Sequence, residues 1–200
     1  DAESIRCTEA GATHLFHNGT EMMYTHSAGI KLNDSKKIYL GTGNDLQIYH
    51  DASHSYIKDA GTGTLQILTD QLRINNAAGS ENMIKADEDG AVELYYDNFK
   101  SFETWSNGIY VYGPEGGGGI VRLYGDEGDD NADKWDLNAN TNGTLLVRNY
   151  ASGSWENSII ATGNGNVELY YDNSKKLETT SGGVTVTGTL IATANIEASN

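Results

Sequence analysis

The chain has 200 residues, a formal net charge of -15 and one cysteine, and Leu, Ile, Val and Phe make up just under a fifth of it. A single cysteine excludes a disulfide framework. The acidic balance, with no basic run longer than two residues, argues against nucleic-acid binding. A chain so poor in aliphatic residues is either disordered or finds burial against partner chains. Its 12 Tyr and its short apolar alternations favour a folded chain that oligomerises.

The two ends of the chain and its longest apolar runs bear on where the protein assembles. No secretory signal opens the chain, and no apolar run approaches the roughly 18 residues of a membrane span. We therefore expect no membrane insertion and assembly in a reducing cytoplasm. The chain lacks an initiator Met and ends in a stretch similar to the start of another module, so we expect a fragment or a processed product.

An internal repeat organises the chain. Its first copy, from Thr13 to Leu32, matches the segment that starts at Val92 with an offset of 79. The heptapeptide V-E-L-Y-Y-D-N occurs at 92–98 and again at 167–173, and the surrounding 24 positions from Gly90 and from Gly165 contain 15 identities. Agreement at this level indicates duplication. We call these three segments the A copies.

A second unit, the B copy, alternates with the first. Leu46 to Asp51 (L-Q-I-Y-H-D) matches Val121 to Asp126 (V-R-L-Y-G-D), and a downstream stretch also matches, with Trp155 as its one insertion. The order A-B-A-B-A predicts a repeat protein with one aliphatic anchor per copy, namely Leu15, Ile48, Leu94, Leu123 and Leu169. We expect boundaries at 1–40 (A), 41–113 (B-A), 114–188 (B-A, after the corner Pro114–Gly119) and 189–200 (a further module or tail).

Each A copy is predicted to be a three-stranded β-meander. In the last copy the strands are Val167–Tyr171, Leu177–Thr180 and Val184–Thr187, separated by turns at Asp172–Lys175 and Ser181–Gly183. Thr, Val, Tyr and Gly dominate, and no window keeps a helical apolar stripe. The predicted fold class is all-β.

Strand alternation gives each copy two faces that both require burial. One face carries the aliphatic anchors, and the other carries an aromatic residue in every copy: Phe16, Tyr49, Tyr95, Tyr124 and Tyr170. An isolated meander is marginally stable in water. Several identical chains around a shared axis would cover both faces, which predicts an elongated, intertwined or prism-like oligomer.

The acidic run G-D-E-G-D-D-N-A-D is a candidate cation site. Carboxylate oxygens are the ligands that calcium prefers, and the run supplies five of these side chains: Asp126, Glu127, Asp129, Asp130 and Asp133. Their spacing is not that of an EF-hand, so a solvated acidic loop is the alternative. Calcium is the one cofactor that the sequence suggests.

Two histidines occupy equivalent slots in different copies. His17 and His50 stand where Tyr96 and Tyr171 stand in later copies. An axis shared by identical chains would gather symmetry mates of each histidine, and imidazole at such an axis can hold a transition metal. The simpler interpretation, hydrogen bonding within the sheet, is favoured because no His-x-His pair is present.

Some aromatic residues break the repeat. These positions are Trp105, Tyr110, Tyr112, Trp135 and Trp155, and threonines replace the first three in the last copy. Exposed aromatic rings stack on sugar rings or on partner surfaces. We therefore consider them a candidate receptor-binding or glycan-binding group, with packing inside the assembly as the alternative.

No motif indicates an enzyme. Carboxylate pairs are uninformative among 28 acidic residues, and no nucleophile motif or phosphate-binding loop is present. Two functions stay open beside that of a structural and receptor-binding protein. They are a polysaccharide depolymerase and a fibrous matrix or surface-layer protein.

The repeats resemble a known family. V-E-L-Y-Y-D-N-S-K-K-L-E-T-T-S-G-G-V-T-V-T-G-T-L, together with G-T-G-N-D-L-Q-I-Y-H-D and D-E-G-D-D-N-A-D-K-W-D-L, is similar to modules of bacteriophage tail-fibre and virion structural proteins, particularly of phages that infect marine cyanobacteria. The resemblance implies a homotrimeric β-rich fibre or spike in the virion, attached to other tail or baseplate proteins. It also implies binding to a host surface glycan or envelope protein.

Overall fold

The structure is a computed structural model and describes residues 4–9 and 11–194. Among these residues it contains nineteen β-strands and two single-turn 3₁₀ helices. The all-β prediction is confirmed. The chain divides into two units, residues 1–68 and 69–200, and each is described by itself.

The first unit holds two antiparallel sheets whose strands follow chain order. The four-stranded sheet consists of β1 (Ile5–Cys7), β2 (Thr13–His17), β3 (Thr20–His26) and β4 (Gly29–Leu32). The three-stranded sheet consists of β5 (Lys37–Leu40), β6 (Leu46–His50) and β7 (Ser55–Asp59).

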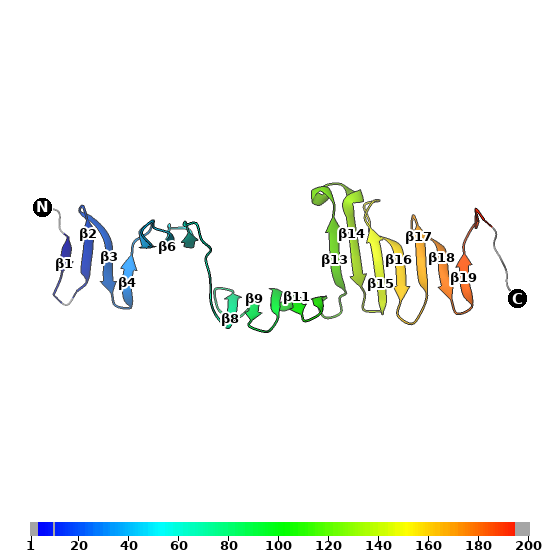
Figure 1. The fold of residues 1–200 in the computed structure, drawn as a ribbon, viewed down its shortest axis with the longest axis horizontal. Helices are drawn as coiled ribbons and strands as arrows, with labels where there is room; N and C mark the ends of the chain where they lie inside the picture. The colour runs from blue at the N-terminus through cyan, green and yellow to red at the C-terminus, as the bar shows by residue number, and fades with distance from the viewer. Residues whose placement is uncertain (1–3, 10, 195–200) are drawn as a thin grey trace. The chain divides into compact units, whose positions relative to one another are not determined.

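The second unit also holds two antiparallel sheets in meander order. Figure 1 shows their strands following one another in sequence order within each sheet. The five-stranded sheet consists of β8 (Gln71–Asn75), β9 (Asn82–Asp87), β10 (Val92–Tyr96), β11 (Phe99–Trp105) and β12 (Gly108–Val111). The seven-stranded sheet consists of β13 (Gly119–Tyr124), β14 (Lys134–Ala139), β15 (Thr144–Asn149), β16 (Glu156–Thr162), β17 (Val167–Tyr171), β18 (Ser174–Thr180) and β19 (Gly183–Val186).

The three A copies share fine structural detail. In each copy, the backbone pairing between the first two strands is interrupted by a β-bulge. The bulge comes immediately after Leu15, Leu94 and Leu169. In each, a threonine hydroxyl accepts the backbone N–H of the residue twelve positions earlier at 2.9 Å, namely Thr25 from Thr13, Thr104 from Val92 and Thr179 from Val167. Duplication of the sequence has therefore duplicated the backbone geometry.

The turn between the first two strands is shorter than predicted. Only Asp172 and Asn173 separate β17 from β18, and both have positive φ values of 47° and 57°. Two consecutive residues of this kind form the type I′ turn, whose twist matches that of a hairpin. The expected four-residue turn at Asp172–Lys175 is wrong because Ser174 and Lys175 already pair with β17.

One apolar residue from every strand forms a cross-strand row, which we call the aliphatic ladder. Direct pairings connect its members within each sheet. The four rows are Ile5–Leu15–Met23–Leu32, Ile38–Ile48–Ile57, Ile74–Ile84–Leu94–Phe102–Val111 and Val121–Leu137–Val147–Ile159–Leu169–Leu177–Val186.

The ladder contains four of the five predicted anchors. In the fourth copy Val121 takes the place expected for Leu123. Leu123 lies on the same face, two residues further along β13, and pairs with Trp135. The sequence alignment at offset 75 pairs Ile48 with Leu123. In the structure, the residue of the fourth copy that joins the cross-strand row is Val121, two positions earlier.

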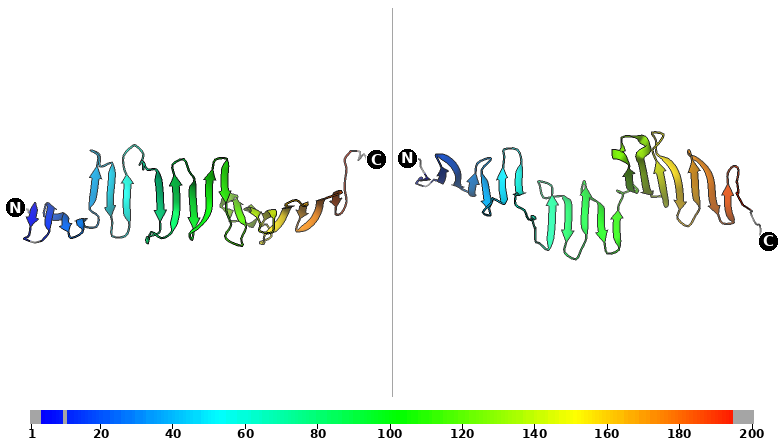
Figure 2. Two further views of the ribbon diagram at one scale, coloured as in Figure 1. Left: turned by 90° about the horizontal axis from the view of Figure 1, so that it is seen from below. Right: turned by 45° about the horizontal axis from the view of Figure 1, so that its top comes forward.

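No hydrophobic side chain in the described residues is buried, so the aliphatic ladder does not form a hydrophobic core within a single chain. Within each sheet the strands form one layer (Figure 2). The side chains that are buried are polar: Glu103 is 4 % exposed, Asp136 1 % and Asn138 8 %. All three lie on the face opposite the ladder, since each is an odd number of residues from a ladder member on its own strand.

Candidate functional site

The face opposite the ladder, which we call the polar face, holds a repeated ion-pair network. In the second A copy the Lys100 ammonium bonds to Glu103 and lies 3.2 Å from Glu93, while Tyr112 donates its hydroxyl proton to Glu103. The third A copy repeats the centre of this network, because Lys175 bonds to Glu178 and lies 3.1 Å from Glu168.

These contacts favour the charged forms of the network. The Tyr95 hydroxyl and Lys100 lower the pKa of Glu93, and Lys100 and Tyr112 lower the pKa of Glu103. In turn, the Glu103 carboxylate raises the pKa of Lys100. The network is satisfied within one chain.

Several aromatic residues of the polar face have partners in their own sheet. Tyr95 donates its hydroxyl to Glu93 at 2.7 Å, and Tyr170 does the same to Glu168. Tyr49 stacks on Tyr56 with 4.6 Å between ring centroids. On this face, these three of the five aromatic residues therefore have contacts within one chain, whereas Tyr124 is 51 % exposed.

The first A copy carries a different pair in the same place. His14 and Glu21 occupy the slots of Glu93 and Lys100, and their Nδ1 and Oε2 atoms lie 2.6 Å apart. The carboxylate thus moves from the first slot to the second, and an imidazole takes the slot of Glu93. His14 lowers the pKa of Glu21, and its ring stacks on Tyr24 at 5.3 Å.

A second polar cluster lies on β14 and β15, and no sequence motif predicts it. The Arg148 guanidinium bonds to both oxygens of Asp136, with 2.9 Å for Nε–Oδ1 and 2.6 Å for Nη2–Oδ2. The Trp155 ring centroid lies 5.2 Å from Arg122 and 5.4 Å from Arg148, the two residues that flank Asp136 across the strands. The inserted tryptophan therefore packs over a buried, bidentate ion pair.

The five aromatic residues proposed for recognition separate into three environments. Trp105 and Tyr110 stack at 5.7 Å, and Tyr110 meets Tyr112 edge to face at 6.2 Å, all on the polar face of the five-stranded sheet. Trp105 is 55 % exposed. Trp155 belongs to the arginine cluster, and Trp135 lies on the ladder face beside Leu137. Only the first three form a group, which we call the aromatic patch.

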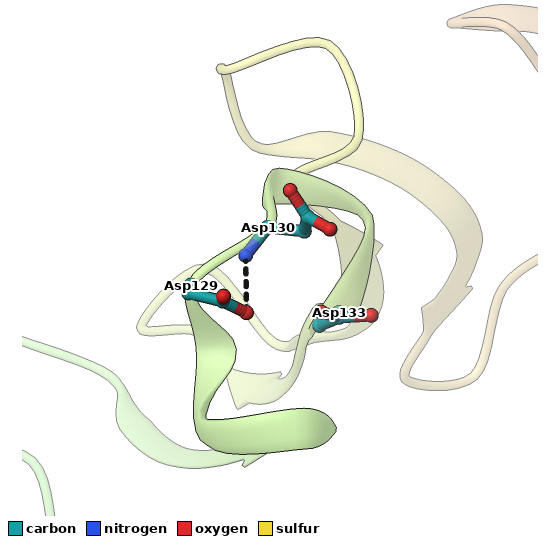
Figure 3. Close-up of side chains that lie close together, drawn as sticks. All are labelled: Asp129, Asp130 and Asp133. Atoms are coloured by element: carbon teal, nitrogen blue, oxygen red, sulfur yellow. Dashed lines mark hydrogen bonds between the residues drawn. The ribbon is translucent and has the colours of Figure 1, made fainter.

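The acidic run lies in the loop between β13 and β14, which is nine residues long where the first B copy has four. The carboxylates of Asp129, Asp130 and Asp133 offer oxygens within 4.8 Å of one another. Figure 3 shows these side chains around the loop and the Asp130 N–H donating to Asp129 at 3.0 Å. Asp126 and Glu127 are outside the group, so the structure gathers three of the five predicted ligands.

Both predicted histidines lie on the ladder face. His50 Nδ1 is 3.1 Å from the Ser55 hydroxyl, and His50 lines an open hollow of about 470 Å³ together with the ladder residues Ile48 and Ile57. His17 Nε2 is 3.4 Å from the side chain of Asn18. His50 thus has a partner on the neighbouring strand, whereas the partner of His17 is a residue of the adjoining turn.

Comparison with known proteins gives no assignment. No family model, no curated protein and no solved structure matches the chain. Among the described residues, no helix has the length and apolar character needed to cross a membrane.

Proposed function

We propose that the chain is a segment of a homotrimeric phage tail fibre or spike, in which identical copies cover one another's aliphatic ladders and the polar faces point outward. The ladder is the observation that carries this proposal. Nineteen strands each contribute one apolar residue to it, and the chain alone buries none of them. Within each sheet the apolar residues lie on one face, which favours a partner surface that covers each row.

The exposed area supports an obligate assembly. The chain exposes 14978 Å², whereas a compact monomer of its mass exposes about 9,200 Å². The excess of about 5,800 Å² is of the size that obligate interfaces bury. Covering the ladders would supply the hydrophobic stabilisation that a single layer of strands lacks.

The number of copies and the virion setting come from the resemblance of the repeats to tail-fibre modules. Copies of the same ladder are complementary because each presents the same aliphatic row. In such an assembly the polar face stays in water, where its ion pairs are satisfied. The chain would then be structural rather than enzymatic, with other tail or baseplate proteins as neighbours.

Attachment to a host surface is the second part of the proposal. The aromatic patch of Trp105, Tyr110 and Tyr112 lies on the outward polar face and is exposed. The same positions in the third A copy are threonines. A local departure from a scaffold that is otherwise repeated favours a role in recognition, with a host glycan or envelope protein as the partner.

Sedimentation equilibrium of the unmodified chain tests the assembly. We expect a mass of about 65 kDa, that of three 21.6 kDa chains, and no loss of this species on dilution from micromolar to nanomolar concentration. Obligate oligomers have no stable folded monomer, so dissociation should accompany unfolding. A folded monomer of 21.6 kDa at micromolar concentration would overturn the proposal.

A further inference from the structure

The same hollow occurs in all three A copies. In the second copy it has a volume of about 450 Å³ and is lined by Asp89, Gly90, Ala91, Thr104, Trp105 and Ser106. All six equivalent residues line a hollow of about 330 Å³ in the third copy, and five of the six, together with Tyr24, line one of about 510 Å³ in the first. These volumes fall within the roughly 300–1,000 Å³ of ligand pockets. Three occurrences at one place indicate that the repeat itself builds the hollow.

The hollow lies at one margin of the meander, between two turns that are separated in sequence by the β10–β11 turn. One wall is the turn that leads from β9 into β10, and the other is the turn between β11 and β12. Glycine closes the first turn tightly, because a Cβ on Gly90 would lie 2.9 Å from the Cβ of Asp87. The bond from the Val92 N–H to the Thr104 hydroxyl ties the two walls together.

The lining has constant and variable positions. Gly, Thr and Ser recur in all three copies, as Gly90, Thr104 and Ser106 do in the second. The residue between the Thr and the Ser changes, being His26 in the first copy, Trp105 in the second and Thr180 in the third. The Gly, Thr and Ser positions thus form a constant frame, and each copy presents a different side chain to its hollow from the variable position.

The second copy has the chemistry of a sugar site. Trp105 offers an exposed indole, the Asp89 carboxylate can accept sugar hydroxyls, and the Ser106 hydroxyl has no partner among the described residues. An aromatic wall with few polar groups is typical of ligand pockets. Asp89 follows Asp87 and Glu88 in a chain of net charge -15, which disfavours acidic sugars.

We infer that the hollow beside Trp105 binds a neutral hexose unit of a surface glycan, and that the residue at the variable position decides whether each A copy binds sugar. The inference rests on the proposed attachment function and gives it a site and a ligand class. The third copy, with Thr180 in the variable position, is the non-binding version of the same frame.

Reciprocal exchange between copies tests this inference. The variants are Trp105→Thr, which installs the residue that the third copy carries, and Thr180→Trp, which installs the residue of the second copy. The probes are methyl glucoside and methyl galactoside, with glucuronic acid as the acidic comparison. The readouts are saturation-transfer NMR, indole fluorescence and the number of sites per chain.

We expect at least one neutral glycoside to bind the unmodified chain at one site. Affinity should fall at least tenfold in Trp105→Thr, and Thr180→Trp should show a second site. Absence of binding by both neutral glycosides, equal binding by Trp105→Thr, or preference for glucuronic acid would each overturn the inference. The sedimentation mass of the same samples reports separately on assembly, so a trimer without sugar binding refutes the site alone.

Discussion

Replacing Ile159 by Lys should abolish the assembled species, whereas replacing Ile160 by Lys should leave it intact. The two residues are adjacent on β16, are both aliphatic and half-buried, and point to opposite faces. Ile159 lies in the ladder between Val147 and Leu169. A lysine there would place an unpaired ammonium against the apolar rows of other copies, at a cost of several kcal/mol per chain.

Ile160 is the matched control because its substitution has the same chemistry. Its cross-strand neighbour on β17 is Glu168, so a lysine at 160 meets an opposite charge on the polar face. Sedimentation velocity should therefore show monomer or aggregate for Ile159→Lys and the assembled species for Ile160→Lys. Equal assembly of the two variants would mean that the ladder face is not the interface.

The second large effect is expected at Arg148. Changing it to Ala leaves the Asp136 carboxylate buried without its bidentate partner, since that side chain is 1 % exposed. Removing one member of a buried pair costs about 3–5 kcal/mol. Because domains are stable by only about 5–15 kcal/mol, urea unfolding of Arg148→Ala should show a greatly lowered midpoint.

Arg122 provides the control for this variant. It also lies over Trp155, but no carboxylate partner for it is found in the described part of the chain. Arg122→Ala should therefore cost much less than Arg148→Ala. The double variant Asp136→Ala/Arg148→Ala should be more stable than Arg148→Ala alone, because the uncompensated charge is gone. A double variant as unstable as the single one would assign the loss to packing against Trp155.

The parts of the fold that depend on local pattern were predictable. Alternation over Val167–Tyr171 and its repetition at offset 75 gave the meander and the two faces. The turn length was wrong because Asp and Asn both tolerate positive φ, which lets Asp172 and Asn173 close the hairpin without Ser174. The length of such a turn can be predicted from the sequence when the turn type that Asp and Asn favour is considered.

The features that sequence alone missed depend on cross-strand register. Asp136 and Arg148 are twelve residues apart and become neighbours only because β14 and β15 pair in one register. Trp155 was recognised as an insertion, but its position over those residues follows from the same register. The hollow beside Trp105 joins two turns that lie about 15 residues apart in the sequence, so no linear motif could identify it.

We propose that copies of the chain cover the ladder face and leave the polar face in water. Thiol labelling of the assembled protein tests it most directly, with single cysteines placed at 159 or at 160 in a chain whose exposed Cys7 is changed to Ser. We predict that a maleimide reacts rapidly at 160 but reaches 159 only after unfolding. Equally rapid labelling at both positions in the assembled, folded protein would contradict it.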